Sequence, residues 1–283
     1  MPHNTTSDAP VLEIALSTVD GRLAQNHKLI TQIATLKIPV VVVNQLRGST
    51  KHLSLDALGW SAEHAQIIHM NTMGLSVSRN TAMAAIRSQW ALLVDDDIAL
   101  DGKAFALLKQ RLQRTTDWKN VGALATRLMK DENTPWREEP QDLSVIEGRQ
   151  TEVLRRIQRI NSMELVLNVS ALRSWGITFD TRFGLGAPTT NGGEEVMLLD
   201  SILRCGGRIL PVNLAPRLHP EESSGQANNP ATAFTQGAVH RFVFGSSRWL
   251  ALFVVYALKR VRSGELALVV YYARGGKWAS RQA

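Results

Sequence analysis

The sequence contains a single cysteine, Cys205, among its 283 residues. No internal disulfide can therefore form, and a reducing cytosol is the compartment that fits best. The longest apolar run, residues 249–258, has ten residues, whereas a membrane-spanning helix needs about twenty. The first residues are polar and lack the basic-then-apolar layout of a secretion signal, so we expect residues 1–10 to form a disordered lead. The composition, 44% hydrophobic and 20% charged, is that of an ordinary globular protein.

Charge is balanced everywhere except at the C-terminal end. Residues 241–283 carry eight Lys and Arg side chains against one acid, Glu265, and account for the whole net charge of +7. Aromatic residues make up only 6% of the chain. A basic end without stacking aromatics in a polar groove does not make a nucleic-acid-binding surface, so we expect no nucleic-acid partner.

Strand-like and helix-like segments alternate over the first 130 residues. We expect strands at 11–18, 38–45, 65–71 and 90–94, and helices at 21–37, 78–89 (with Ser78 as N-cap) and 103–114. The β-branched run in 38–45 is typical of a parallel strand covered on both faces. The alternation predicts an α/β fold with an open, mainly parallel sheet flanked by helices. Further on we expect strands at 121–129, 164–176 and 208–214 and a helix at 193–207, whereas 130–159 gives no clear assignment.

The C-terminal end has a different pattern. Two apolar blocks, 249–258 and 266–272, alternate with Lys and Arg and have Trp and Tyr at their edges. This pattern predicts an amphipathic helical tail over 241–283 that lies in a membrane surface. The alternative is a helical pair packed on the main domain, 11–240, with its basic groups merely solvated.

Three adjacent carboxylates, Asp95, Asp96 and Asp97, follow the strand expected at 90–94. Ligands of open α/β sheets bind beyond the carboxyl ends of the strands. Because side chains alternate along a strand, Asp95 and Asp97 should point one way and Asp96 the other. Two converging carboxylates suit Mg²⁺ or Mn²⁺ shared with a diphosphate. The alternative is a solvated turn that opens the next helix, with one aspartate as its cap.

Other motifs accompany this cluster in a defined order. They are S-T-x-D at 17–20, G-L-S-V-S-R-N at 74–80, the aspartates, F-D-T-R-F at 179–183, G-G-E-E at 192–195, and His219. Each is weak alone, but in this order the sequence resembles the family 2 glycosyltransferases. These are inverting enzymes of the GT-A fold that use nucleotide-sugar donors. The resemblance covers roughly residues 11–220 and implies a GT-A-like, Rossmann-related sheet.

The resemblance also assigns roles to residues. It implies that the donor is held by Ser17, Thr18, Asp20, Arg22, Ser78, Arg79, Asn80, Asp95 and Asp96. It implies a divalent cation on Asp95, Asp97 and His219, and a UDP-, GDP- or dTDP-sugar as donor. Glu195 aligns with the family's catalytic aspartate, so the resemblance makes it the general base. Because glutamate is one methylene longer than aspartate and the position of a base matters, Glu194 is the alternative. The competing interpretations are that both glutamates only complement a helix dipole and that His219 caps a loop.

The expected activity is that of a metal-dependent hexosyltransferase (EC 2.4) acting on a hydroxyl of a glycan or lipid-linked acceptor. The basic, apolar tail suggests the inner face of the plasma membrane, and hence bacterial cell-envelope polysaccharide assembly. Two alternatives are a sugar nucleotidyltransferase and a non-catalytic, membrane-tethered module that binds nucleotide sugars. The first should show a Gly-rich phosphate loop with a basic residue after the first strand, which residues 17–23 do not offer. The donor sugar, the acceptor and the oligomeric state stay open.

Overall fold

The structure is a computed structural model that describes residues 10–48, 50–138, 141–219 and 229–282, so most of the expected N-terminal lead lies outside it. In the described part, a seven-stranded sheet has the order β3-β2-β1-β4-β8-β6-β9. Its strands are β1 (Leu12–Val19), β2 (Val40–Gln45), β3 (Ala65–Met70), β4 (Trp90–Asp95), β6 (Val121–Ala125), β8 (Leu165–Asn168) and β9 (Arg208–Pro211). All neighbours pair in parallel except β8, which is antiparallel to β4 and β6. The predicted open, mainly parallel sheet is confirmed.

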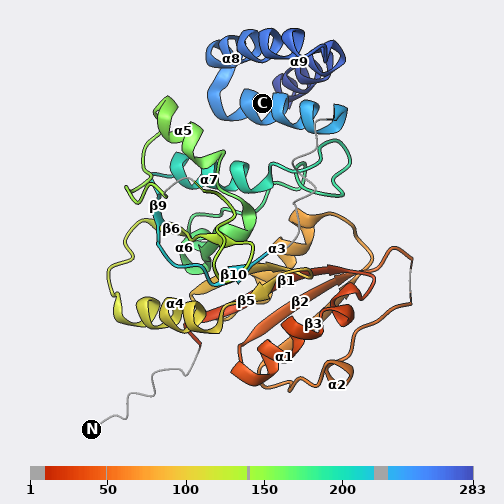
Figure 1. Cartoon of the computed structure of the whole chain (residues 1–283), viewed down its shortest axis with the longest axis vertical. Coiled ribbons are helices and arrows are strands. Elements are labelled where there is room, and N and C mark those ends of the chain that lie inside the picture. The colour runs from red at the N-terminus through yellow and green to blue at the C-terminus, as the bar shows by residue number, and fades with distance from the viewer. Residues whose placement is uncertain (1–9, 49, 139–140, 220–228, 283) are drawn as a thin grey trace.

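A small second sheet and a set of helices complete the described fold (Figure 1). The second sheet has the order β5-β10-β7, formed by Ala99–Leu100, Arg217–Leu218 and Leu128–Met129. The α-helices are α1 (His27–Leu36), α2 (Leu55–Leu58), α3 (Leu75–Ala85), α4 (Gly102–Arg114), α5 (Thr151–Ile157), α6 (Val169–Ser174), α7 (Glu194–Arg204), α8 (Pro230–Arg262) and α9 (Leu266–Ser280). Two 3₁₀ turns, η1 (Arg22–Gln25) and η2 (Ser162–Glu164), precede α1 and β8.

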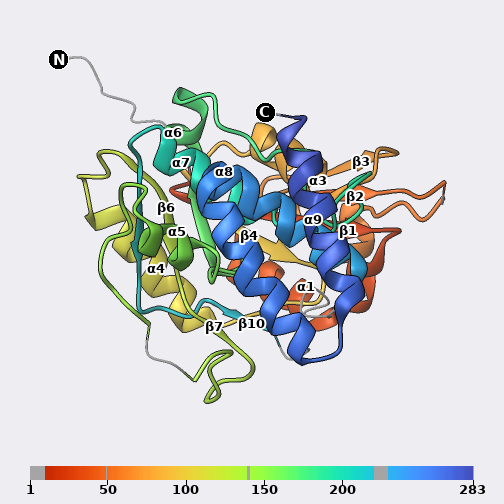
Figure 2. The same ribbon diagram turned by 90° about the horizontal axis from the view of Figure 1, so that it is seen from above.

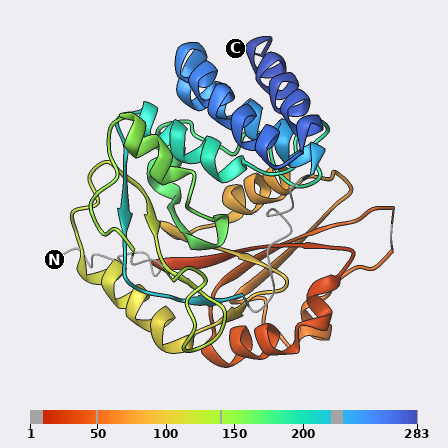
Figure 3. The same ribbon diagram turned by 45° about the horizontal axis from the view of Figure 1, so that its top comes forward.

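The core lies on both faces of the main sheet. Every residue of β2 is buried, as the β-branched run predicts for a strand covered on both sides. Helices α1 and α4 cover one face and α3 and α7 the other (Figure 3). The helices present apolar stripes to the sheet; in α4, for example, Phe105, Leu108 and Leu112 are buried at a spacing of three and four residues. The carboxyl ends of β1 and β4 emerge side by side.

The structure corrects several expected boundaries. Helix α3 begins at Leu75 with Gly74 as its N-cap, so Ser78 lies inside the helix rather than capping it. Residues 164–176 are not one strand, because β8 ends at Asn168, whose side chain accepts a hydrogen bond from the Ala171 amide and caps α6. The segment 130–159, left unassigned from the sequence, contributes α5.

The two C-terminal helices lie at one end of the molecule, away from α1 and α4 (Figure 1), and run side by side (Figure 2). Helix α8 is bent at Gly245, whose φ of 74° lies in the left-handed region. Before the bend, α8 packs so closely on α9 that a Cβ on Gly237 would clash with the Tyr272 carbonyl, and one on Gly275 with the Phe234 carbonyl. The domain boundary expected at 240/241 therefore falls within a helix that is continuous from the main body.

Candidate active site

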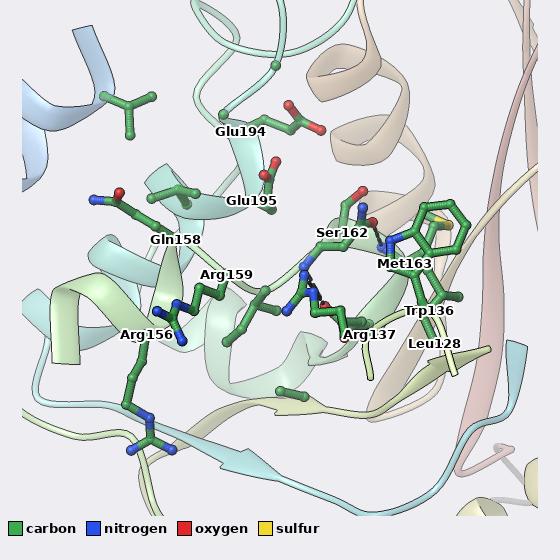
Figure 4. Close-up of a pocket in the computed structure, with 18 of the residues that line it drawn as sticks. Leu128, Trp136, Arg137, Arg156, Gln158, Arg159, Ser162, Met163, Glu194 and Glu195 are labelled. Carbon is green, nitrogen blue, oxygen red and sulfur yellow. Dashed lines mark hydrogen bonds and ion pairs between the residues drawn. The ribbon is translucent and has the colours of Figure 1, made fainter. Parts of the chain in front are cut away.

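A cavity of about 1200 Å³ opens beyond the carboxyl ends of β4 and β6 (Figure 4). Asp95, Glu194, Glu195 and His219 all contribute to its lining. These residues come from the end of β4, the first turn of α7 and the end of β10. The fold thus brings Asp95 and the Glu-Glu pair to one cavity, although about a hundred residues separate them in the sequence, whereas Asp96 and Asp97 are not part of its lining.

The three aspartates diverge at the end of β4. The Asp96 carboxylate accepts a 2.6 Å hydrogen bond from the Thr18 hydroxyl and pairs with Arg22 at 2.9 Å. Asp97 lies on the other side, with its Oδ1 4.0 Å from Nε2 of His219. Burial raises the pKa of Asp95, and its neighbouring carboxylates raise it further, against the Arg79 charge. Strand β4 ends at Asp95, so Asp96 and Asp97 lie in the following turn, beyond the strand alternation that was expected to orient them. Asp96 holds the turn after β1 in place, and Asp97 lies near His219.

A buried arginine joins the two acidic clusters. Arg79 of α3 is 1% exposed and donates to Glu194 Oε1 at 2.8 Å and to the Ser162 hydroxyl at 3.0 Å. Its Nη2 also lies 3.5 Å from Asp95 Oδ1. The Phe179 ring lies 5.7 Å from the guanidinium carbon, within the range of a cation–π contact. The guanidinium group is planar and carries several N–H donors, so Arg79 can contact all of these partners at once. A lysine ammonium group could not do so in the same geometry.

Replacing Arg79 by methionine should lower the free energy of unfolding by about 3 kcal/mol or more, because Glu194 would keep a buried charge without its partner. Urea unfolding followed by circular dichroism would measure the change. Arg114→Met, which removes an exposed arginine at the end of α4, should change stability by less than about 0.5 kcal/mol. Equal stability of Arg79→Met and wild-type protein would contradict the bridging role.

Glu194 and Glu195 differ sharply in environment. Both begin α7 after Gly193, which adopts a left-handed conformation with φ 82°. Glu194 is buried and held by Arg79, whereas Glu195 is half-buried on the cavity lining. Burial, followed by the charge of Glu194, raises the pKa of Glu195 to about 8. Of the two carboxyl groups, Glu194 is thus bound to Arg79, whereas Glu195 is the more exposed one in the cavity lining.

The other residues expected at the nucleotide are engaged by the protein itself. The Ser78 hydroxyl donates to the Ser17 hydroxyl at 2.8 Å and ties α3 to β1. The Asn80 side chain exchanges two hydrogen bonds with the main chain of Phe179, each 2.8 Å long. Asp20 lies in the turn after β1 with φ 51° and accepts a hydrogen bond from the Arg47 amide. Ser17, Asp20, Ser78 and Asn80 are not part of the cavity lining, and their hydrogen bonds hold β1, the turn after it and α3 in place.

The residues proposed for a metal form an incomplete set. Within the described residues, no group of three or more His, Cys, Asp or Glu side chains is placed to hold an ion. Asp97 and His219 nevertheless offer one carboxylate oxygen and one imidazole nitrogen 4.0 Å apart. Such a donor pair suits Mn²⁺, with diphosphate oxygens and water in the remaining positions. The buried Oδ1 of Asp95 also has no hydrogen-bond partner. The residues fit a cation that arrives together with a nucleotide.

The sequence did not identify the outer wall of the cavity. Arg137, Arg156, Gln158 and Arg159 line it from the segment that had no assignment (Figure 4). Trp136 also lines the cavity, with its ring 5.1 Å from that of His219. Trp136 and Trp175 both pack against the core, but of the two only Trp136 lines the cavity, where its ring could stack on a sugar. The only signal in the sequence was the mixture of polar residues and one tryptophan.

The fold and the position of the cavity define a GT-A-like glycosyltransferase fold. The crystal structure of Staphylococcus aureus TarS 1-349 superposes with a TM-score of 0.58 and 14% sequence identity, over 96% of this chain and 92% of that one. The same TarS fragment in complex with UDP gives 0.56 at 12% identity, over 96% and 92%. Its complex with UDP-GlcNAc gives 0.53 at 13%, over 95% and 92%. No protein-family model and no characterised protein matches the sequence itself.

Proposed function

We propose that this protein transfers a sugar from a nucleotide-diphosphate donor to an acceptor hydroxyl with inversion. The observation that carries the proposal is the single cavity lined by Asp95, Glu195 and His219 at the carboxyl end of the sheet. That is where open α/β sheets bind ligands. The similarity to TarS, whose fragment was solved with UDP and UDP-GlcNAc, supports a nucleotide-sugar donor and favours a uridine nucleotide.

In this proposal Glu195 is the general base that removes the proton from the acceptor hydroxyl as it attacks the sugar. Its half-buried carboxyl lines the cavity, and its raised pKa makes the carboxylate a stronger base than an exposed glutamate. Glu194 and Arg79 position the start of α7 relative to Asp95. Thr18, Asp96 and Arg22 hold the turn after β1 in place for the nucleotide.

Asp97 and His219, with Asp95, would hold the divalent cation. When bound, the cation would stabilise the negative charge that develops on the departing nucleoside diphosphate. The Trp136 ring next to His219 would then offer a flat apolar face to one of the sugars.

The pH dependence of transfer should report the environment of Glu195. Since the base must be deprotonated and burial raises its pKa to about 8, kcat/KM should rise with pH, with its midpoint near pH 8 and a plateau about one pH unit higher. Glu194→Gln removes the neighbouring charge that raises this pKa, so the rise should move to lower pH. Initial rates between pH 5.5 and 9.5 would measure both profiles. A profile that does not move in Glu194→Gln, or a rise centred below pH 5 in the wild type, would contradict this assignment.

We also propose the setting in which the enzyme acts. It is a hexosyltransferase at the inner face of the plasma membrane, with a glycan or lipid-linked acceptor of bacterial envelope polysaccharide assembly. The basic, apolar C-terminal helices support this placement. In the described residues one helix, α8, is long and apolar enough to cross a bilayer by length and composition.

Nucleotide release from a panel of UDP-, GDP- and dTDP-sugars with Mn²⁺ would test the proposed function. We expect slow hydrolysis of at least one donor, abolished by EDTA, and faster release when an acceptor is added. Saturable donor binding without any turnover would favour the non-catalytic module. Release of pyrophosphate from a nucleoside triphosphate and a sugar phosphate would favour a nucleotidyltransferase instead.

A further inference from the structure

The second half of α8 and the start of α9 carry most of the exposed large apolar side chains of the described residues. In the described residues, seven of the twelve exposed large hydrophobic side chains lie between residues 250 and 270. We name these seven the apolar stripe: Leu250, Val254, Val255, Leu258, Val261, Leu266 and Val270. Spacings of four, four and three residues from Leu250 to Val261 place their side chains on one side of the helix.

The aromatic residues of this segment are not part of the stripe. Trp249, Phe253 and Tyr256 stack on or near the fully buried Tyr272 of α9. The Tyr272 hydroxyl is hydrogen-bonded to His240 Nδ1 at 2.7 Å, in the part of α8 before the bend. The sequence had suggested Trp and Tyr at the edges of a membrane segment, but the structure uses them to hold the two helices together. The surface left outside is aliphatic.

Basic side chains border the stripe. Four of them are exposed, namely Arg248, Lys259, Arg262 and Arg274. Residues 241–283 contain one acid, Glu265, and it is paired with Arg260 at 2.6 Å. A shallow hollow of about 440 Å³ lies within this region. Its lining consists of Val255, Leu258, Lys259, Arg262 and Ser263. Aliphatic groups beside two ammonium or guanidinium groups match the start of an acyl chain next to an anionic headgroup.

We propose that the apolar stripe and its basic border bind the surface of an anionic phospholipid bilayer, with the hollow at Lys259 and Arg262 receiving a lipid headgroup. Shallow insertion of an apolar face combined with attraction to anionic lipid is the established mode of interfacial helices. The net positive charge disfavours a second copy of the same surface, because the exposed cations would repel one another.

Insertion across the bilayer does not fit the structure. The first half of α8 belongs to the main body, where Val239 and Val243 are buried and the Val243 carbonyl accepts a hydrogen bond from Arg149. The part after Gly245, residues 246–262, is only about 25 Å long at 1.5 Å per residue, and it ends in three cations. A bilayer core is about 30 Å thick.

The same helix links the lipid surface to the cavity. Thr232, Thr235 and Val239 of α8 line the cavity, and a Cβ on Gly193 would lie 2.6 Å from the Val239 side chain. A membrane bound at the stripe would therefore contact the same helix that forms one wall of the cavity before its bend. This placement favours an acceptor that is carried by a lipid. That extension rests on the proposed function, whereas the proposed lipid contact is independent of it.

Sedimentation with vesicles tests the lipid contact without any donor or acceptor. The full chain should bind vesicles of phosphatidylcholine and phosphatidylglycerol (3:1) and bind much less to pure phosphatidylcholine. Lys259→Glu/Arg262→Glu should weaken binding by about tenfold or more, since each basic residue near an anionic surface adds measurable affinity. Val255→Asp/Leu258→Asp should weaken binding to a similar extent by removing the inserted groups.

Matched changes on α4 serve as controls. Lys103→Glu/Lys109→Glu reverses two exposed charges, and Leu107→Asp replaces an apolar side chain that is 53% exposed. Both should bind vesicles as the wild type does. Light scattering without lipid tests whether a second copy of this chain, rather than a bilayer, covers the stripe. Absence of vesicle binding, equal loss in the α4 controls, or a dimer that Val255→Asp/Leu258→Asp converts to monomers would overturn the proposal. Nucleotide release measured without vesicles keeps this outcome separate from the proposed function.

Discussion

Replacing Glu195 by glutamine should lower the rate of sugar transfer by about 10²–10⁴-fold, the usual contribution of a positioned general base. Glutamine keeps the size of the side chain but cannot accept the proton of the acceptor hydroxyl. Donor affinity should stay near the wild-type value, because Glu195 lies on the first turn of α7 and the expected donor contacts are on β1, the turn after it, α3 and the end of β4. Transfer kinetics and calorimetric donor binding, measured on the same preparation, would give both quantities.

Two further variants sharpen this test. Glu63→Gln makes the same chemical change at an exposed site before β3 and should leave transfer unchanged. Glu194→Gln should retain more activity than Glu195→Gln, since Glu194 is bound to Arg79. If Glu195→Gln retained full activity while Glu194→Gln lost it, Glu194 would be the base. If both retained it, the proton would be removed elsewhere.

Replacing Asp97 by alanine should reduce both Mn²⁺-dependent donor binding and turnover by about a hundredfold or more. Asp97 and His219 supply the two donor atoms, 4.0 Å apart, that would hold the cation against the diphosphate. His219→Ala should have a similar effect, and the double variant should lose little beyond either single change because the two groups act as a unit. Calorimetric titration of UDP with and without Mn²⁺ would measure the loss.

Asp56→Ala removes an exposed aspartate from the first turn of α2 and provides the control. It should bind UDP as the wild type does. The metal assignment would be wrong if Asp97→Ala bound UDP with full affinity in the presence of Mn²⁺, or if EDTA did not affect wild-type binding. Glu195→Gln should keep the Mn²⁺ dependence, which separates the two acidic clusters by function.

Much of the fold was predictable because local patterns and tertiary contacts agree in it. The β-branched run of β2 is buried throughout, as predicted. The cap of α4 is Asp101, which accepts a hydrogen bond from the Ala104 amide, and not one of the three aspartates after β4. The start of α3 was missed because Gly74 has no capping side chain, and its φ of 121° is a conformation that glycine tolerates. A short strand followed at once by a helix, as at Asn168, gives a mixed pattern that resembles one long strand.

Of the residues predicted for the site, Asp95, Glu194, Glu195 and His219 line one cavity, whereas the residues predicted to hold the nucleotide on β1 and α3 do not line it. The positions of the Asp and Glu clusters at strand and helix ends follow from the motif order. The bridge by Arg79 could not be foreseen, since it depends on α3, β4 and α7 meeting in three dimensions. Likewise, Asp95, Asp96 and Asp97 have different partners, and these partners come from segments that are distant in the sequence. The arginine-lined wall comes from irregular segments, whose paths no periodicity predicts.

The most direct test of the central claim is the location of a bound nucleotide. Crystals grown with UDP and Mn²⁺, with data collected to show anomalous scattering from manganese, would place both ligands. We predict the diphosphate at the carboxyl ends of β1 and β4, with the manganese peak next to Asp97 and His219 and the β-phosphate open to the cavity that Glu195 lines. A nucleotide bound on another surface, away from these residues, would contradict the account.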